Sequence, residues 1–154
     1  MGNLYVVRHA DAGTAGRGDG PDRLRPLSER GRRQAEGLRS QLAGVGIARL
    51  LASPFQRCLD TLGPLGDELG IPVDADDRLQ EKTGAFGVLE LAEELSGTTA
   101  AVCSHGDVIP DLLEELARRG VAIEDELRWP KASAWVLTRG ATGFLRARYI
   151  PPPC

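Results

Sequence analysis

Asn3–Val7, with the sequence NLYVV, is a short apolar run that ends abruptly at the charged pair Arg8 and His9. It is rich in β-branched and aromatic residues, which favours a buried strand. Two further short apolar runs, Leu50–Ala52 and Ala100–Cys103, also end at polar residues. The three runs predict three buried strands, each of which leads directly into polar residues.

Two segments between these runs have the spacing of amphipathic helices. Apolar residues recur at helical intervals from Glu29 to about Ala43, and the preceding serine offers an N-cap. A second helix is expected to begin at Ser53–Pro54, with the serine as its cap, and to reach Gly70. The Gly-Pro pair at 63–64 should bend or locally break this second helix.

The rest of the chain alternates between shorter elements. We expect a strand at Pro72–Asp74, a loop at Leu79–Gly87, helices at Val88–Leu95 and Val108–Arg119, and strands at Ser133–Thr138 and Phe144–Ile150. Strands that alternate with amphipathic helices predict an α/β fold. The expected architecture is a three-layer sandwich, with a mainly parallel sheet and helices on both faces.

Length and composition restrict the kind of protein. The 154 residues suit one domain, and no linker or internal repeat divides them. The net charge of -3 offers no bulk attraction to nucleic acid or to an anionic membrane surface. Apolar stretches are far shorter than a membrane-spanning helix and the start lacks the basic run of a secretory signal, so a cytoplasmic protein is expected. Three cysteines without C-x-x-C spacing predict reduced thiols.

The sequence contains two histidines, His9 and His105, and both follow predicted buried strands. Ligand sites in open α/β sheets lie beyond the carboxyl ends of parallel strands, so the two imidazoles share one crevice if their strands are neighbours. Arg8 and Arg57 should lie near the same edge. Two imidazoles among guanidinium groups suit a doubly charged oxyanion, most economically a phosphoryl group. Taken singly, each such residue is more often packed or solvated than catalytic, and two histidines alone leave a metal shell incomplete.

Five motifs resemble those of the histidine phosphatase superfamily, whose members include the phosphoglycerate mutases. Val6–Ala10 (VVRHA) resembles the Arg-His-Gly signature, with Ala10 in the glycine place. The other four follow in the family's order: Leu24–Ser28 with Gly31, Ser53–Thr61 (SPFQRCLDT), Leu79–Glu81 (LQE) and Val102–Gly106 (VCSHG). The resemblance covers nearly the whole chain. It implies a single histidine phosphatase domain over residues 1–154 with a phosphoglycerate mutase-like fold.

The resemblance also implies roles for the matching residues. His9 is expected to be the nucleophile that becomes transiently phosphorylated. Arg8, Arg57 and Arg25 would bind the phosphoryl oxygens, and His105 would add a hydrogen bond and, if protonated, positive charge. These groups take the place of a metal ion, so neither a metal nor another cofactor is expected.

Two further positions match the family. The backbone N–H of Gly106, near a helix start, is placed to help bind the phosphoryl group. Glu81 resembles the general acid that protonates the leaving oxygen and then activates water, and its alternative is an exposed loop carboxylate. Small phosphohistidine phosphatases of the SixA type, which the chain resembles in length and in Arg25–Leu27 and Ser53–Phe55, manage without that acid.

Short matches later in the chain indicate a second likeness. Val108–Leu112, Lys131–Ser133 and Ala147–Ile150 resemble the phosphatase domain that follows a Nudix domain in actinobacterial nucleotide-sanitising hydrolases. That likeness implies a nucleoside diphosphate or a similar anhydride as substrate. Lys131 is then expected either on a substrate phosphate or in solvent.

The sequence thus predicts a metal-independent phosphatase of the histidine acid phosphatase type. It would hydrolyse a phosphate monoester or phosphoanhydride through a phosphohistidine on His9, and bind a small phosphorylated metabolite or nucleotide, but neither nucleic acid nor membrane. One alternative is a protein phosphohistidine phosphatase of the SixA type. Another, of a different class, is a non-catalytic phosphate-binding regulatory module. Substrate choice is expected to depend on the loops Asp11–Arg23 and Lys82–Gly87.

Overall fold

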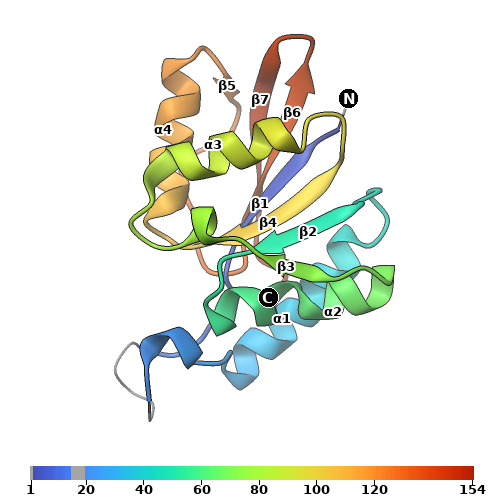
Figure 1. Cartoon of the computed structure of the whole chain (residues 1–154), viewed down its shortest axis with the longest axis vertical. Coiled ribbons are helices and arrows are strands. Elements are labelled where there is room, and N and C mark those ends of the chain that lie inside the picture. Colours follow the sequence, from blue (N-terminus) through green and yellow to red (C-terminus); the bar gives the residue numbers. More distant parts are fainter. Residues whose placement is uncertain (1, 15–19) are drawn as a thin grey trace.

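The computed structural model describes residues 2–14 and 20–154, which form one mixed sheet with helices on both faces (Figure 1). In chain order the strands are β1 (Leu4–Arg8), β2 (Arg49–Ala52), β3 (Val73–Ala75), β4 (Ala100–Ser104), β5 (Ala122–Ile123), β6 (Ala134–Gly140) and β7 (Gly143–Ile150). Across the sheet their order is β3-β2-β4-β1-β6-β7-β5. All neighbouring pairs are parallel except those of β6, which is antiparallel to β1 and to β7.

The helices form the two outer layers. Helices α1 (Glu29–Leu42) and α2 (Gln56–Leu69) cover one face of the sheet, and α3 (Gly84–Glu94) and α4 (Val108–Arg118) cover the other (Figure 1). Each helix pair packs against the sheet through its own apolar cluster. The expected three-layer α/β architecture is confirmed.

β1 is buried on both of its faces. Leu4 and Val6 belong to the cluster under α3 and α4, whereas Tyr5 and Val7 belong to the cluster under α1 and α2. A strand that is covered on both sides has no polar face, which is why it reads as a continuous apolar run in the sequence.

α1 begins where the sequence predicts. Ser28 Oγ accepts a hydrogen bond from the backbone N–H of Gly31 at 3.0 Å, as an N-cap does. A Cβ on Gly31 would lie 1.9 Å from the carbonyl oxygen of Asp11. Only glycine therefore allows the first turn of α1 to pack so closely on the segment that follows β1.

The expected start of α2 is wrong. The helix begins at Gln56, with Phe55 as its N-cap, rather than at Ser53–Pro54. Ser53 is fully buried, and its hydroxyl lies 2.9 Å from His105 Nε2. The serine is therefore drawn into the interior by a partner far away in the sequence instead of capping the helix.

The expected break inside α2 is also absent from the structure. The helix continues through Pro64 and ends at Gly70, which has the left-handed conformation with a φ of 70°. Leu62 and Leu65, on either side of the proline, are completely buried. Their packing holds the helix together across the hydrogen bond that proline cannot make.

α3 begins at Gly84, one turn before the predicted start at Val88, so the loop before it is shorter than expected. Gly84 and Gly87 have low helix propensity, so the sequence gives no sign that the first turn of α3 is helical. A Cβ on Gly87 would lie 2.4 Å from the carbonyl oxygen of Arg78, so this glycine serves helix packing. β5 has only two residues and carries no periodic signal.

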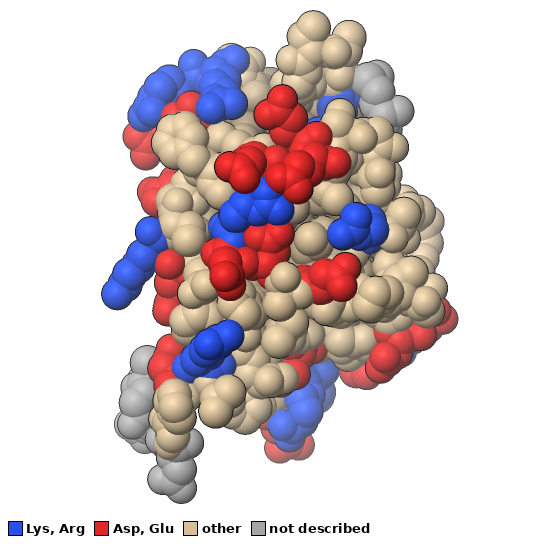
Figure 2. Space-filling view, in the orientation of Figure 1, with Lys and Arg blue, Asp and Glu red and all other residues tan. Residues whose placement is uncertain are grey.

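Acidic and basic side chains are intermixed on the face of the molecule shown in Figure 2. Among the ion pairs of the described residues, Arg78 pairs with Asp76 at 2.8 Å, with Glu90 at 3.0 Å and with Glu94. Within residues 2–14 and 20–154, no helix is both long and apolar enough to cross a lipid bilayer.

Candidate active site

The seven residues that the sequence singles out all line one open cavity of about 590 Å³. They are Arg8, His9, Arg25, Arg57, Glu81, His105 and Gly106. Gly13, Thr14, Lys82, Asp107 and Lys131 complete its described wall. Of the loop Asp11–Arg23, which was expected to influence specificity, residues 15–19 lie outside the described part of the chain.

The cavity lies at the carboxyl ends of β1 and β4. These strands are parallel neighbours, so the residues that follow them lie at the same edge of the sheet. Arg8 pairs with Ser104 in the sheet, so His9 and His105 leave the two strands side by side. Their ring centroids are 5.5 Å apart, and one ring points its edge at the other. The two histidines therefore share one crevice, as expected.

His9 is held as a neutral imidazole with one free nitrogen. Its Nδ1 lies 2.8 Å from the carbonyl oxygen of Ala10, and because a carbonyl can only accept, Nδ1 carries the proton. Burial lowers the pKa of His9 from 6.5 to about 3; the Ala10 contact opposes this shift, and the charges of Arg57, His105 and Arg8 add to it. Nε2 is thus unprotonated at neutral pH, as a nitrogen nucleophile must be.

This buried neutral histidine predicts a loss of stability in mild acid. The unfolded chain takes up the proton below pH 6.5, whereas folded His9 takes it up only near pH 3. Stability is therefore lost as the pH falls, and this residue removes about 2 kcal/mol between pH 7 and pH 5. Urea unfolding of the wild type and of His9→Gln at both pH values measures this change in the free energy of unfolding. If that free energy changes equally with pH in the two proteins, His9 is not its source.

Arg57 lies in the first turn of α2, with its side chain 2% exposed. Its Nη1 contacts Asp22 Oδ2 at 3.2 Å and the main-chain oxygen of the same residue at 3.1 Å. Its Nη2 lies 3.5 Å from Glu81 Oε2, and the guanidinium stacks on Phe55 at 4.9 Å. A buried cation is thus fixed between two carboxylates and an aromatic ring.

Arg8 and Arg25 are fixed by other contacts. Nη1 of Arg8 donates to the carbonyl oxygen of Trp129 at 2.9 Å, and a Cβ on Gly106 would lie 2.7 Å from the guanidinium carbon of Arg8. Gly106 therefore leaves room for Arg8. Arg25 Nε lies 3.0 Å from Asp22 Oδ1, and its Nη1 donates to the carbonyl oxygen of Ala12 at 2.5 Å.

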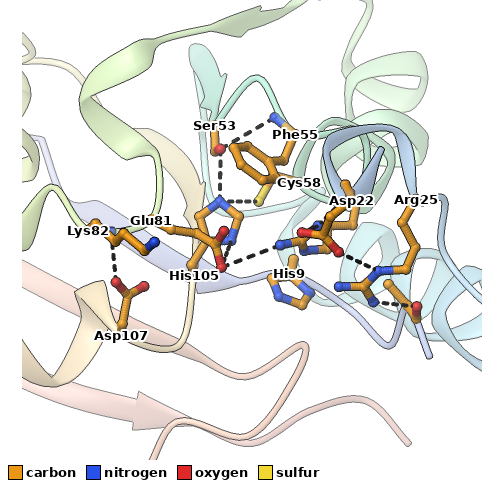
Figure 3. A network of polar contacts seen from close by, with 12 residues as sticks. His9, Asp22, Arg25, Ser53, Phe55, Cys58, Glu81, Lys82, His105 and Asp107 are labelled. Atoms are coloured by element: carbon orange, nitrogen blue, oxygen red, sulfur yellow. Dashed lines mark hydrogen bonds and ion pairs between the residues drawn. The ribbon is translucent and has the colours of Figure 1, made fainter. Parts of the chain in front are cut away.

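Asp22, in the short 3-10 helix Asp22–Leu24, was missed by the sequence analysis. Its carboxylate contacts Arg25 (Figure 3) and also contacts Arg57, which comes from a different element of the fold. Its neighbours in the sequence are a proline and an arginine, and nothing in that pattern distinguishes it from an ordinary loop carboxylate.

His105 is held from its outer side. Nε2 lies 2.9 Å from Ser53 Oγ and 3.6 Å from Cys58 Sγ, and both partners are completely buried (Figure 3). A hydroxyl can donate or accept, so Ser53 can serve the neutral or the protonated ring. On the other side Nδ1 lies 3.9 Å from Glu81 Oε2.

Four buried side-chain nitrogen atoms have no hydrogen-bond partner among the described residues, and three of them, Arg8 Nε, Arg57 Nε and His105 Nδ1, belong to residues that line this cavity; the fourth is Arg139 Nε. Buried donors are nearly always paired in native proteins, so unpaired ones call for an explanation. An oxyanion bound in the cavity would meet the side chains of these three residues, which supply two guanidinium groups and an imidazole. In residues 2–14 and 20–154, no three His, Cys, Asp or Glu side chains come together as a metal site would require.

The comparison with known proteins agrees with this geometry. The sequence model of the histidine phosphatase superfamily (branch 1) matches residues 4–87, a range that includes His9, Arg57 and Glu81 but not His105. A Mycolicibacterium smegmatis protein described as an 8-oxo-(d)GTP phosphatase is 36% identical over 157 aligned residues. The alignment covers 97% of this chain and 48% of that protein, so the chain spans about half of its relative's length.

Solved structures show the same fold. The protein histidine phosphatase SixA in complex with tungstate superposes with a TM-score of 0.74 and 25% identity, over 99% of this chain and 97% of its own. YhfR of Bacillus stearothermophilus superposes with a TM-score of 0.74 and 18% identity, over 94% of each chain. At 18% identity, this second likeness concerns the fold alone.

Proposed function

Since the chain belongs to the histidine phosphatase superfamily (branch 1), we propose that it is a phosphohydrolase that forms a phosphohistidine on His9. The observation that carries this proposal is that Arg8, Arg57 and His105 line one cavity with His9, whose imidazole is neutral. Arg8 and Arg57 would bind the equatorial phosphoryl oxygens, and Nδ1 of His105 would donate a further hydrogen bond. The single sheet that positions all these groups supports one histidine phosphatase domain over residues 1–154.

The proposed reaction has two displacements at phosphorus. In the first, His9 Nε2 forms the P–N bond, the P–O bond to the leaving group breaks, and its electron pair goes to the leaving oxygen, which Glu81 protonates. In the second, water attacks phosphorus, its proton passes to Glu81, and the P–N bond breaks to release inorganic phosphate. Glu81 lines the same cavity as His9, as this exchange of protons requires.

The descriptions of the relatives suggest two classes of substrate, a nucleotide and a phosphohistidine protein. One relative is described as an 8-oxo-(d)GTP phosphatase and another as a protein histidine phosphatase. Glu81 favours an ester or anhydride, because a protonated imidazole leaves without an acid whereas an oxygen leaving group gains from one. A small phosphorylated metabolite or nucleotide is therefore the proposed substrate, and a phosphohistidine protein is the second candidate.

Phosphate release from three substrates tests the proposal. GDP, 4-nitrophenyl phosphate and a phosphohistidine peptide are compared with EDTA present, each with the His9→Ala protein as the blank. Release from GDP or the aryl ester supports the first class, and preference for the peptide supports the second. Absence of release from all three contradicts the phosphatase proposal and favours a phosphate-binding module.

The variant Glu81→Gln should separate the two substrate classes. We expect ester hydrolysis to fall much more than phosphohistidine hydrolysis, by about 10²-fold where the leaving oxygen needs the proton, because both substrates use Glu81 for the attacking water but only the ester uses it for the leaving group. Steady-state kcat on both substrates measures the difference. If kcat falls equally on the two substrates, Glu81 acts on the attacking water or on the structure and has no separate role at the leaving group.

A further inference from the structure

Cys58 lies in the first turn of α2, directly after Arg57, and its side chain is completely buried. Its sulfur lies 3.6 Å from Nε2 of His105 (Figure 3). The same helical turn thus places Arg57 in the cavity wall and Cys58 against a histidine of that wall. The proposed reaction assigns a role to Arg57 and to His105 but leaves this buried thiol without one.

The groups around the Cys58 sulfur favour a negative charge on it. Cys103, a second buried cysteine on β4, hydrogen bonds to this sulfur. Nε2 of His105 is placed to donate a further hydrogen bond, and the guanidinium of Arg57 adds positive charge nearby. The main-chain oxygen of Ser104 can accept a thiol proton, but at 3.8 Å it is a more distant partner than the imidazole nitrogen.

The two buried thiols differ in how readily they lose a proton. Burial opposes the ionisation of Cys58, but hydrogen bonds from the neighbouring thiol and imidazole, together with nearby positive charge, lower its pKa from 9.0 to about 6. Burial raises the pKa of the Cys103 thiol. Cys103 therefore keeps its proton and acts as the donor, and Cys58 is the cysteine that ionises.

The surroundings of the His105 ring favour its positively charged form. A carboxylate oxygen of Glu81 lies 3.9 Å from Nδ1, and Nε2 faces the sulfur of Cys58 and the hydroxyl of Ser53. That hydroxyl, 2.9 Å away, can accept a hydrogen bond from a protonated Nε2. The nearest titratable ring, that of His9, is neutral and lies 5.5 Å away between centroids.

Two arginines of the cavity wall oppose a positive charge on His105, and carboxylates counter both of them. Arg8 lies close enough to Asp107 for the two charges to interact. Nη1 of Arg57 contacts Asp22 at 3.2 Å. The positive field of the arginines is therefore reduced at the ring, whereas the Cys58 sulfur is in direct contact with it.

From this arrangement we propose that Cys58 and His105 form a buried thiolate–imidazolium pair beside the proposed phosphoryl site. The proton leaves the Cys58 sulfur and is held on Nε2 of His105, while Nδ1 keeps its own proton for the phosphoryl group. The two opposite charges are in contact, and the hydrogen bonds of Cys103 and Ser53 satisfy them further, as a buried ion pair requires. Cys58 is then a positioning residue that acts on the substrate only through His105. The inference rests on the proposed phosphatase function and deepens it.

The pair determines the pH range in which the ring can stabilise a phosphoryl group. An opposite charge within about 4–6 Å favours the charged form of a titratable group, by about one pH unit or more. The thiolate therefore keeps the proton on His105 to higher pH than a neutral neighbour would. We expect the alkaline limit of phosphatase activity to depend on Cys58.

The ultraviolet absorbance of thiolates tests the pair in the free protein. In Cys154→Ser, which lacks the exposed cysteine, about one thiolate per chain should be present at neutral pH. This absorbance should disappear in Cys58→Ser/Cys154→Ser. It should persist in the matched buried control Cys103→Ser/Cys154→Ser, because serine still supplies a hydrogen-bond donor. Absence of the thiolate from Cys154→Ser, or its persistence without Cys58, overturns the pair.

The pH dependence of kcat/KM tests what the pair does for the reaction. Cys58→Ser keeps a small polar side chain that does not ionise near neutral pH. The ratio of its kcat/KM to that of the wild type should fall about 10-fold between about pH 6 and pH 8, as the alkaline limit moves down by about one unit. Cys154→Ser should follow the wild type at every pH.

A loss in Cys58→Ser that is the same at every pH overturns the inference, because it assigns Cys58 to packing alone. If Cys58→Ser does not fold, the absorbance of Cys154→Ser and of Cys103→Ser/Cys154→Ser still decides whether the thiolate exists. If the wild type releases phosphate from no substrate, the proposed function fails. The absorbance then supports or overturns the ion pair by itself, so the two failures are distinguishable.

Discussion

His9→Ala is expected to lower phosphatase turnover by about 10³-fold or more, because it removes the atom that would bond to phosphorus. No other described imidazole can substitute for it. His105 directs Nε2 toward Ser53 and Cys58, and its other nitrogen faces Glu81. Initial rates on the preferred substrate, together with trapping of acid-labile phosphoprotein after rapid mixing, measure both the loss of turnover and the loss of the intermediate.

The fold and the anion site of this variant should remain. Arg8 and Arg57 are held by contacts that do not involve His9, so orthovanadate should still bind to the His9→Ala protein. Binding by calorimetry and an unchanged circular dichroism spectrum show that the site is intact. Residual turnover above about one per cent of the wild-type rate would contradict the assignment of the nucleophile.

Arg57→Lys should cause the second large loss, about 10³-fold in kcat/KM. The guanidinium contacts Asp22 through Nη1 and lies beside Glu81 through Nη2 at the cavity wall, and an ammonium cannot make both contacts in the same geometry. Loss of a preorganised donor to the transition-state oxygens typically costs 10²–10³-fold, and lysine also loses the planar fork. Steady-state kinetics and the inhibition constant for orthovanadate should both report the change.

Arg78→Lys provides the control for this variant. Arg78 also sits among carboxylates, Asp76, Glu90 and Glu94, but it does not line the cavity. The control should keep its activity while losing a similar set of ion pairs. If Arg57→Lys and Arg78→Lys have the same effect on kcat/KM, the loss at Arg57 comes from general destabilisation and not from phosphate binding.

The sheet was predictable because its central strands are buried on both faces. Three apolar runs became β1, β2 and β4, and the cap at Ser28 set the start of α1. The errors arose where a tertiary contact outweighs a local preference. Serine is a favourable N-cap residue, but the hydroxyl of Ser53 contacts His105 instead. Proline usually breaks a helix, but Pro64 lies inside α2, which is held together by its packing.

The same division applies to the site. His9 and His105 were predicted together because each follows a strand, and the adjacency of β1 and β4 then placed them face to face. The supporting residues were not predictable, since Asp22 and Ser53 take their roles from partners distant in the sequence. Such pairings depend on the order of the strands in the sheet, and the residue pattern of a single segment does not predict that order.

The contacts of Arg57 bear on the departure of phosphate from the proposed site as well as on its binding. Before any ligand arrives, Asp22 and Glu81 already neutralise this buried cation. An incoming anion must therefore compete with these two carboxylates for the guanidinium, and the carboxylates take its place again when the anion departs. These two carboxylates lower the free energy of the empty state, so we expect inorganic phosphate to leave quickly and product inhibition to be weak in the proposed reaction.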